Sequence, residues 1–217
     1  MKIATWNLER LKKNKSEAIL SKLAELDADI LILTETDSRI GLGEKYTSVS
    51  TQALFDGYDG IKYKKTENRV TIWTKYKVEK QHKTFDNYTS ICVELQTPLG
   101  LLNVYGTIIG VFSGKGERFN EDLKSQLVDI ENLSGNSCLV GDFNITFSGY
   151  VYPSHKARNE LNETFDKLHL NCLTSKIADS VDHIAISENF IQNRKATLAI
   201  WNEDKSLSDH IGICITL

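Results

Sequence analysis

The sequence is dominated by short runs of β-branched and aliphatic residues, each bounded by polar or turn-forming residues. Runs of this length and composition are typical of β-strands rather than helices. Nine such runs predict strands, at residues 3–6, 30–34, 70–74, 90–95, 101–108, 138–140, 183–187, 197–201 and 211–217. This many strands in a single chain leaves little of the sequence for helices.

Three segments show the spacing of amphipathic helices, with apolar residues recurring every three or four positions. They are residues 16–26, 120–133 and 157–168, and Asn120 is a suitable N-cap for the second. Strands therefore outnumber helices by about three to one, and several are separated only by short turns, which disfavours a doubly wound βαβ sheet. The sequence predicts an α+β fold in which two mixed β-sheets pack face to face, with the helices outside.

Length and composition set further limits. A chain of 217 residues is expected to form a single domain, 1–217. No run approaches the roughly 18 to 20 apolar residues of a membrane span, and polar residues follow Met1 too soon for a secretion signal. We therefore expect a cytoplasmic protein without a membrane span, acting as a monomer. The four cysteines form no Cys-x-x-Cys pair, so we expect buried, reduced thiols rather than a zinc site.

The formal net charge of -3 argues against a protein that coats nucleic acid through a broad basic face. It is compatible with a metal-dependent nuclease, because such a site concentrates carboxylates whose charge is offset by the cation. Lysines do cluster locally, at residues 12–15, 62–65 and 75–80.

Carboxylate and carboxamide residues follow four of the predicted strands. They are Asn7, Glu35, the pair Asp142 and Asn144, and Asp209. Each alone is explained by an ordinary turn or cap. Together they predict a ligand site, because strand ends at one rim of a sandwich bring distant positions together. Oxygen donors without cysteine indicate Mg²⁺ or Mn²⁺.

Several short motifs carry a resemblance to a known family. They are Thr5-Trp6-Asn7, Leu33-Thr34-Glu35-Thr36, Val70-Thr71-Ile72-Trp73-Thr74-Lys75, Asn103-Val104-Tyr105, Gly141-Asp142-Phe143-Asn144, Val181-Asp182-His183-Ile184 and Ser208-Asp209-His210. In order and approximate spacing the chain resembles the endonuclease/exonuclease/phosphatase superfamily, which includes DNase I-like nucleases, apurinic endonucleases, sphingomyelinases and inositol polyphosphate phosphatases. The resemblance implies a four-layered α/β/β/α sandwich and metal-assisted attack of water on phosphorus.

The resemblance also implies a metal site. Glu35 matches the principal metal-binding glutamate of the family, with Asn7 and Asp209 beside it. Two neighbouring positions depart from the usual pattern: Thr34 stands where the family commonly has Gln, and Arg69 where it commonly has Gly.

Catalytic roles follow from the same resemblance. Asp142 matches the residue that orients or deprotonates the attacking water, and Asn144 the one that steadies a phosphate oxygen. His210 matches the histidine that contacts the scissile phosphate, and Asp182 the carboxylate that accepts its other ring proton. A histidine held by an aspartate suits charge stabilisation at phosphorus, although an ordinary structural ion pair is the alternative.

Three further features have weaker support. Tyr105 matches a Tyr that ends this strand in the apurinic endonuclease branch, so the resemblance implies a phosphate or substrate contact; an amphipathic rim residue is the alternative. The basic loop 110–118 could meet substrate phosphates. The other four histidines, including His183, lack metal-ligand spacing and are interpreted as surface or strand positions.

Three hypotheses for function remain open. The first is a Mg²⁺-dependent nuclease that hydrolyses phosphodiester bonds in DNA or RNA, favoured by Tyr105 and the basic loop. The second is a phosphatase or phosphodiesterase for a small phosphorylated metabolite or lipid headgroup, favoured by the acidic net charge and the short chain. The third is a catalytically silent binding domain that retains the fold.

Overall fold

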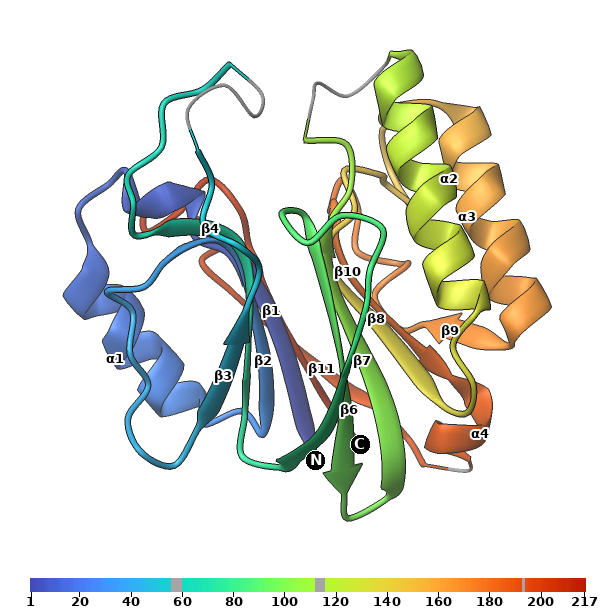
Figure 1. Cartoon of the computed structure of the whole chain (residues 1–217), viewed down its shortest axis with the longest axis horizontal. Helices are drawn as coiled ribbons and strands as arrows, with labels where there is room; N and C mark the ends of the chain where they lie inside the picture. The colour runs from blue at the N-terminus through green and yellow to red at the C-terminus, as the bar shows by residue number, and fades with distance from the viewer. Residues whose placement is uncertain (56–59, 112–115, 193) are drawn as a thin grey trace.

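The structure of the protein is a computed structural model, and it describes residues 1–55, 60–111, 116–192 and 194–217. Within these residues, two six-stranded sheets lie face to face (Figure 1). The first has the order β11-β12-β1-β2-β4-β3 and the second β5-β6-β7-β8-β10-β9. Both sheets are mixed, because β1 pairs with β2, and β7 with β8, in parallel, while the other pairs are antiparallel.

The strands of the first sheet are β1 (Lys2–Asn7), β2 (Ile30–Asp37), β3 (Thr47–Ser50), β4 (Glu67–Thr74), β11 (Thr197–Trp201) and β12 (Gly212–Thr216). Those of the second are β5 (Lys77–His82), β6 (Ser90–Thr97), β7 (Gly100–Ile108), β8 (Ser137–Asp142), β9 (Leu170–Cys172) and β10 (Asp182–Ser187). All nine predicted strands are present. The three additional strands, β3, β5 and β9, lie at sheet edges.

Helices cover the outer faces of both sheets (Figure 1). A short 3-10 helix, η1 (Glu9–Leu11), and α1 (Ser16–Leu26) lie beside the first sheet, whereas α2 (Glu117–Glu131) and α3 (His155–Leu168) lie beside the second. A one-turn helix, α4 (Glu188–Ile191), follows β10. The predicted four-layered sandwich is confirmed. The predicted N-cap of α2 is wrong: the helix begins three residues before Asn120, and Gly116 is its N-cap.

Successive side chains of a strand point to opposite faces of its sheet, and this alternation divides the buried residues into three apolar cores. On β1, Ile3 points into the core between the sheets, while Ala4 and Trp6 pack beneath α1. On β8, Val140 belongs to the inter-sheet core and Leu139 to the core beneath α2 and α3. Residues of the inward-facing set that reach the end of a strand therefore meet at the rim between the two sheets.

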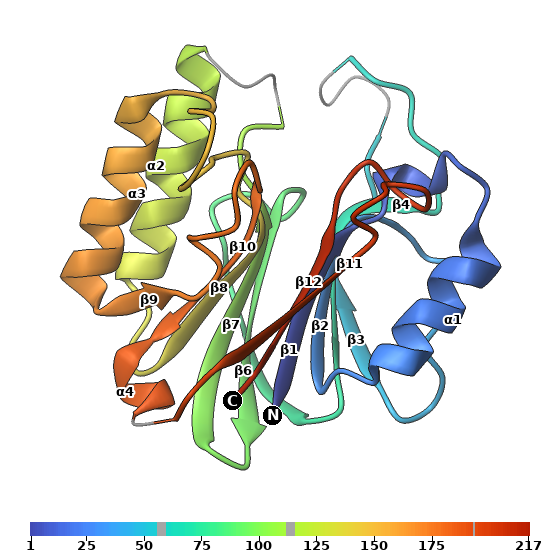
Figure 2. The same ribbon diagram turned by 180° about the vertical axis from the view of Figure 1, so that it is seen from behind.

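The chain termini mark one end of the sandwich. The amino group of Met1 donates to the carbonyl oxygen of Leu217 at 3.1 Å, and both termini lie at the same end of the sheets (Figure 2). Because β1, β2 and β8 all run away from that end, their carboxyl ends lie at the opposite rim. Within the described parts of the chain, helices long and apolar enough for a bilayer crossing are absent. The four cysteines are free thiols, and three of them are buried.

Candidate active site

One pocket at this rim collects most of the polar residues selected from the sequence. Its volume is about 290 Å³. Eight residues were predicted from the sequence to bind metal or act in catalysis. Six of them line this pocket: Asn7, Glu35, Asp142, Asn144, Asp209 and His210. A seventh, Asp182, is hydrogen-bonded to the ring of His210. The structure thus brings together residues from both sheets that are as far as 203 positions apart, from Asn7 to His210.

Asn7 and Asp142 connect the two sheets within the pocket. Both lie in register with the inward-facing positions Ile3 and Val140. The amide Nδ2 of Asn7 donates to Oδ2 of Asp142 at 3.1 Å. The other carboxylate oxygen, Oδ1, accepts the backbone N–H of Asn144 at 3.0 Å. Two donors therefore fix the orientation of a carboxylate that is almost fully buried.

Gly141 allows strand β8 to approach β7 closely just before Asp142. Its φ of 138° is rarely adopted by residues with a side chain, and a Cβ atom there would lie 2.1 Å from the carbonyl oxygen of Thr107. The glycine of the Gly-Asp-Phe-Asn motif is therefore required by backbone packing, and it places the aspartate at the rim.

Glu35 reaches the pocket through a break in strand alternation. Leu31 and Leu33 pack on the outer face of the first sheet, so regular alternation would place Glu35 on that face as well. Instead, Glu35 adopts a left-handed conformation with φ 44° and lines the pocket. Such a conformation costs a non-glycine residue roughly 1 kcal/mol. The carboxylate oxygen Oε1 lies 3.2 Å from Nη1 of Arg69 on β4.

His210 is held as a cation by Asp182. The ring atom Nδ1 donates to Oδ2 of Asp182 at 2.6 Å. Burial alone would lower the pKa of His210, but the charge of Asp182 and this hydrogen bond outweigh burial and raise the pKa to about 10. The opposite ring atom, Nε2, lies 3.8 Å from Oδ1 of Asp209. A positively charged ring therefore faces the pocket.

The backbone before His210 is tied to strand β1. The hydroxyl of Ser208 donates to the carbonyl oxygen of Asn7 at 2.5 Å and accepts the backbone N–H of His210 at 3.2 Å. The indole Nε1 of Trp6 donates to the carbonyl oxygen of His210 at 3.1 Å. The Thr-Trp-Asn and Ser-Asp-His motifs are thus parts of one hydrogen-bonded unit.

The pKa of Asp142 is also displaced. Burial, assisted by the negative charge of Asp182, raises the pKa of Asp142 from 3.8 to about 7. The two aspartates are direct partners in the antiparallel register of β8 and β10. A carboxyl group with this pKa can exchange a proton near neutral pH, which is what a general base requires.

Tyr105 does not belong to this pocket, which corrects the expectation that it contacts substrate. Val104 points into the inter-sheet core, so alternation directs the next side chain, Tyr105, to the opposite face. Its ring is buried beneath α2, and its hydroxyl donates to Oδ2 of Asp129 at 2.8 Å. Burial raises the pKa of Tyr105 well above 10. The basic loop 110–118 lies only partly within the described residues, because 112–115 are outside them.

The pocket residues suit a hard divalent cation. Glu35, Asp142, Asp209 and Asn7 all carry oxygen donors and line the same space, and no cysteine is among the lining residues. Among the described residues, no group of three or more His, Cys, Asp and Glu side chains is placed to hold a metal ion.

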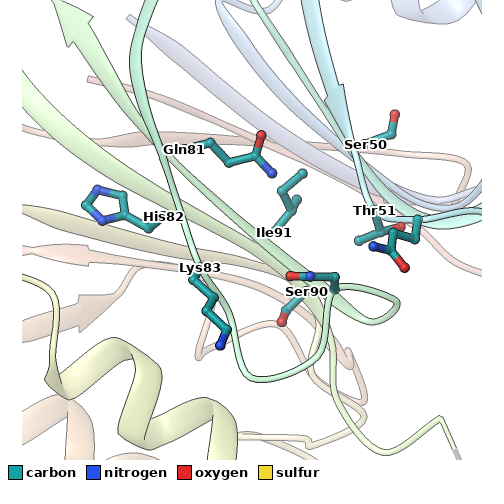
Figure 3. Close-up of a pocket in the computed structure, with 9 residues that line it drawn as sticks. Ser50, Thr51, Gln81, His82, Lys83, Ser90 and Ile91 are labelled. Atoms are coloured by element: carbon teal, nitrogen blue, oxygen red, sulfur yellow. The ribbon is translucent and has the colours of Figure 1, made fainter.

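Two other cavities lie near the same rim. One, of about 340 Å³, shares Asp209 and His210 with the first pocket and extends past them to residues 178–182 and Lys205. The other, of about 430 Å³, lies between the edge strands β3 and β5 (Figure 3). In Figure 3, Gln81 and Ile91 point toward the side of Ser50 and Thr51, whereas His82 points away. This edge cavity contains none of the selected residues.

The model of the endonuclease/exonuclease/phosphatase family matches residues 4–210. The chain belongs to the endonuclease/exonuclease/phosphatase family. No curated protein sequence matches it significantly.

Solved structures of low sequence identity share the fold of this family member. The endonuclease domain of TRAS1, a telomere-specific non-LTR retrotransposon, is 16% identical with a TM-score of 0.73, and the match covers 99% of this chain and 96% of that one. A variant of the 3' phosphatase NExo from Neisseria, bound to product DNA hairpin, is 17% identical with a TM-score of 0.73, covering 100% and 99%. An AP endonuclease from Archaeoglobus fulgidus is 14% identical with a TM-score of 0.70, covering 100% and 99%.

Three polar residues that line the pocket were not predicted as site residues from the sequence: Lys12, Arg69 and Tyr152. The sequence shows Lys12 within a cluster of lysines, and Arg69 at a position where the family commonly has Gly. Neither feature predicted that the side chain lines the site. Tyr152 gave no signal, because it precedes Pro153 in a loop that has no periodic pattern.

Proposed function

We propose that this family member is a divalent-metal-dependent phosphodiesterase that hydrolyses phosphodiester bonds in DNA or RNA. One observation carries the proposal: a buried carboxylate that titrates near neutral pH, Asp142, and a cationic imidazole, His210, line one pocket with the carboxylate of Glu35. Hydrolysis of a phosphodiester needs a base for water, positive charge at the phosphate oxygens and a site for a cation. These residues can supply all three.

The proposed roles follow from position and charge. Glu35, Asn7 and Asp209 would hold Mg²⁺ or Mn²⁺, which when bound polarises a phosphate oxygen and neutralises its charge. Asp142, held by the amide of Asn7, would orient the attacking water and accept its proton. His210, kept protonated by Asp182, would contact the phosphate. Asn144, whose Nδ2 donates to the carbonyl oxygen of Ile109 at 2.9 Å, would be a fixed polar contact for a phosphate oxygen.

A diester substrate is favoured over a monoester by the shape of the site. The pocket of about 290 Å³ and the cavity of about 340 Å³ share Asp209 and His210. A group bound at His210 therefore has space on both sides of the phosphorus, as a nucleic acid strand requires. Lys12 on one side and Lys205 on the other would favour neighbouring phosphates.

A phosphatase or phosphodiesterase acting on a small phosphorylated metabolite or lipid headgroup is the second candidate. It is favoured by two cationic side chains, Lys12 and Arg69, in a pocket of only about 290 Å³. Two positive charges suit the dianion of a phosphomonoester better than the single charge of an internal diester.

The two candidates are separated by substrate. Incubation with single- and double-stranded oligonucleotides and Mg²⁺ is expected to release shorter oligonucleotides, with little phosphate release from a panel of phosphorylated metabolites. Hydrolysis of the panel without strand cleavage, seen as release of phosphate from a monoester or of a phosphomonoester from a diester, would favour the second candidate. Absence of both activities, at any divalent cation tried, would reject both.

The role of Asp142 is tested by Asp142→Asn. The variant is expected to lower kcat/KM at least about 10²-fold, because an amide cannot accept the proton of water. Asp166→Asn on α3, at an exposed position, is the matched control and should leave kcat/KM unchanged. Equal rates for the wild type and a folded Asp142→Asn variant would refute the assigned role.

A further inference from the structure

The carboxylate proposed to bind the metal is paired with a cation of the chain itself. Thr34 pairs with Val70, and Thr36 with Asn68, in the antiparallel register of β2 and β4, which leaves Glu35 opposite Arg69. The guanidinium Nη1 of Arg69 lies 3.2 Å from Oε1 of Glu35. The pair lies in the pocket with Asp142 and His210.

Arg69 is held firmly in this position. Its side chain is 4% exposed, whereas that of Glu35 is 24% exposed. The guanidinium lies 5.1 Å from the ring centroid of Tyr63 and donates to the hydroxyl of the same residue. The guanidinium of Arg10 also lies over that ring, 4.6 Å from its centroid, and is bonded to Glu67 at 2.7 Å. Glu67 and Arg69 are both on β4, so the cluster fixes Arg69 against the rim.

A buried guanidinium beside a metal-binding carboxylate has a direct electrostatic consequence. It already neutralises Glu35, and it repels a divalent cation that approaches the same oxygen atoms. The repulsion is relieved when an anion joins the site, because a phosphate oxygen can contact the guanidinium and the cation together. Arginine is well suited to such a contact, because its planar group offers several donors.

We propose that Arg69 is a phosphate-binding residue that couples the two ligands of the site, so that a divalent cation and a phosphate group bind well together and each binds weakly alone. This inference rests on the proposed function. In the absence of phosphate, Arg69 holds Glu35 and reduces its affinity for the cation. A phosphate group accepts hydrogen bonds from the guanidinium where it stands and thereby weakens its hold on the carboxylate.

The coupling between the two ligands can be measured from their binding constants, without any catalytic reaction. Free Mn²⁺ is counted by electron paramagnetic resonance during titration of the full chain, with and without methylphosphonate, which mimics a phosphate group and is not hydrolysed. For the wild type, saturating methylphosphonate is expected to lower the dissociation constant for Mn²⁺ about tenfold, within the usual range of binding coupling. By reciprocity, Mn²⁺ should tighten methylphosphonate binding by the same factor.

Substitution of the arginine separates coupling from a purely structural role. Arg69→Gln is expected to bind Mn²⁺ about tenfold more tightly than the wild type without methylphosphonate, and to retain a coupling of about twofold or less. Arg39→Gln is the matched control, because Arg39 pairs with Asp37 of β2 at 2.7 Å and does not line the pocket. It should bind Mn²⁺ as the wild type does. Glu35→Gln should lose Mn²⁺ binding.

The possible failures are distinct. Mn²⁺ affinity that depends on Glu35 but is equal or weaker in Arg69→Gln would overturn the role of Arg69 and leave the proposed function standing. No Mn²⁺ binding by the wild type in either condition would overturn the proposed function and this inference with it. Should Arg69→Gln fail to fold, as judged by circular dichroism, the wild type alone decides: absence of coupling between Mn²⁺ and methylphosphonate rejects the proposal.

Discussion

At the scale of single residues, the candidate site depends on groups whose charge is set by burial and by one neighbour each. Asp142 and His210 are both buried, yet burial acts on them in opposite directions: it raises the pKa of the acid and lowers that of the imidazole. Of the two, only His210 has a partner, Asp182, that overcomes the effect of burial. The cationic state of the ring therefore depends chiefly on Asp182, with smaller contributions from the charges of Asp142 and Asp209.

Asp182→Asn tests this dependence. Without the charge and hydrogen bond of Asp182, only Asp142 and Asp209 oppose the effect of burial, so the pKa of His210 is expected to fall well below about 10. Because the ring is charged only below its pKa, the imidazolium form is then lost at a lower pH than in the wild type. The ring nitrogens are followed by NMR during a pH titration, with Asp166→Asn as the control. A midpoint that stays near 10 would mean that another group holds the proton.

At the scale of elements, the period of two along a strand decides which side chains reach the site. Asn7 and Asp142 occupy inward-facing positions, whereas Tyr105 occupies an outward-facing position one residue after Val104. The residue type of Tyr105 suggested a position at the rim of the site. Its place in the alternation of β7 instead puts its side chain beneath α2. A motif gives residue type and order, and only the pairing of strands assigns the face.

Tyr105→Phe tests the face assigned by this register. The change removes the hydroxyl bonded to Asp129 and keeps the ring in its core, so stability is expected to fall by about 1 kcal/mol. Because the side chain does not face the pocket, kcat/KM should stay within about twofold of the wild type. Turnover on the preferred phosphate ester and urea unfolding provide the two readings. A loss above about tenfold in a variant of normal stability would return Tyr105 to the site.

The close contact of β7 and β8 is tested by Gly141→Ala. The new methyl group would meet the carbonyl oxygen of Thr107 at 2.1 Å, on a backbone whose φ of 138° already disfavours alanine. We expect a loss of about 3 kcal/mol in the free energy of unfolding, measured with urea. Gly41→Ala is the matched control, since a Cβ there meets nothing within 4 Å. Equal stability of the two variants would show that β8 moves without cost.

At the scale of the whole molecule, the sequence predicted the layers because most strands are buried and apolar. The strands it did not predict are edges: β5 reads Lys-Val-Glu-Lys-Gln-His and is mostly exposed, so no apolar pattern marks it. Charged edge strands of this kind block pairing with other chains. The left-handed conformation of Glu35 and its ion pair with Arg69 could not be predicted from the sequence either, because a contact between β2 and β4 depends on how the two strands pair.

Beside the site, one buried histidine, His183 on β10, ties together the segments that follow β8 and β9 and the segment that precedes β10. Its Nε2 donates to the carbonyl oxygens of Ile145 at 3.0 Å and Ser180 at 2.9 Å, while Nδ1 accepts the hydroxyl of Thr174 at 3.0 Å. A neutral ring with its proton on Nε2 satisfies all three contacts. Burial lowers the pKa of His183 from 6.5 to about 4, against the opposing charge of Asp182.

The neutral state of His183 predicts how stability changes with pH. Between about pH 6.5 and 4 the unfolded chain binds a proton at this position that the folded chain does not, so stability falls as pH falls through that window. The loss from this group reaches about 3 kcal/mol near pH 4. Other groups titrate there too, so the measured quantity is the difference in unfolding free energy between wild type and His183→Gln, from urea unfolding at several pH values. That difference should shrink on acidification, whereas the difference for His155→Gln, at an exposed position, should not change. A wild-type advantage that is constant with pH would show that His183 accepts its proton in the folded protein.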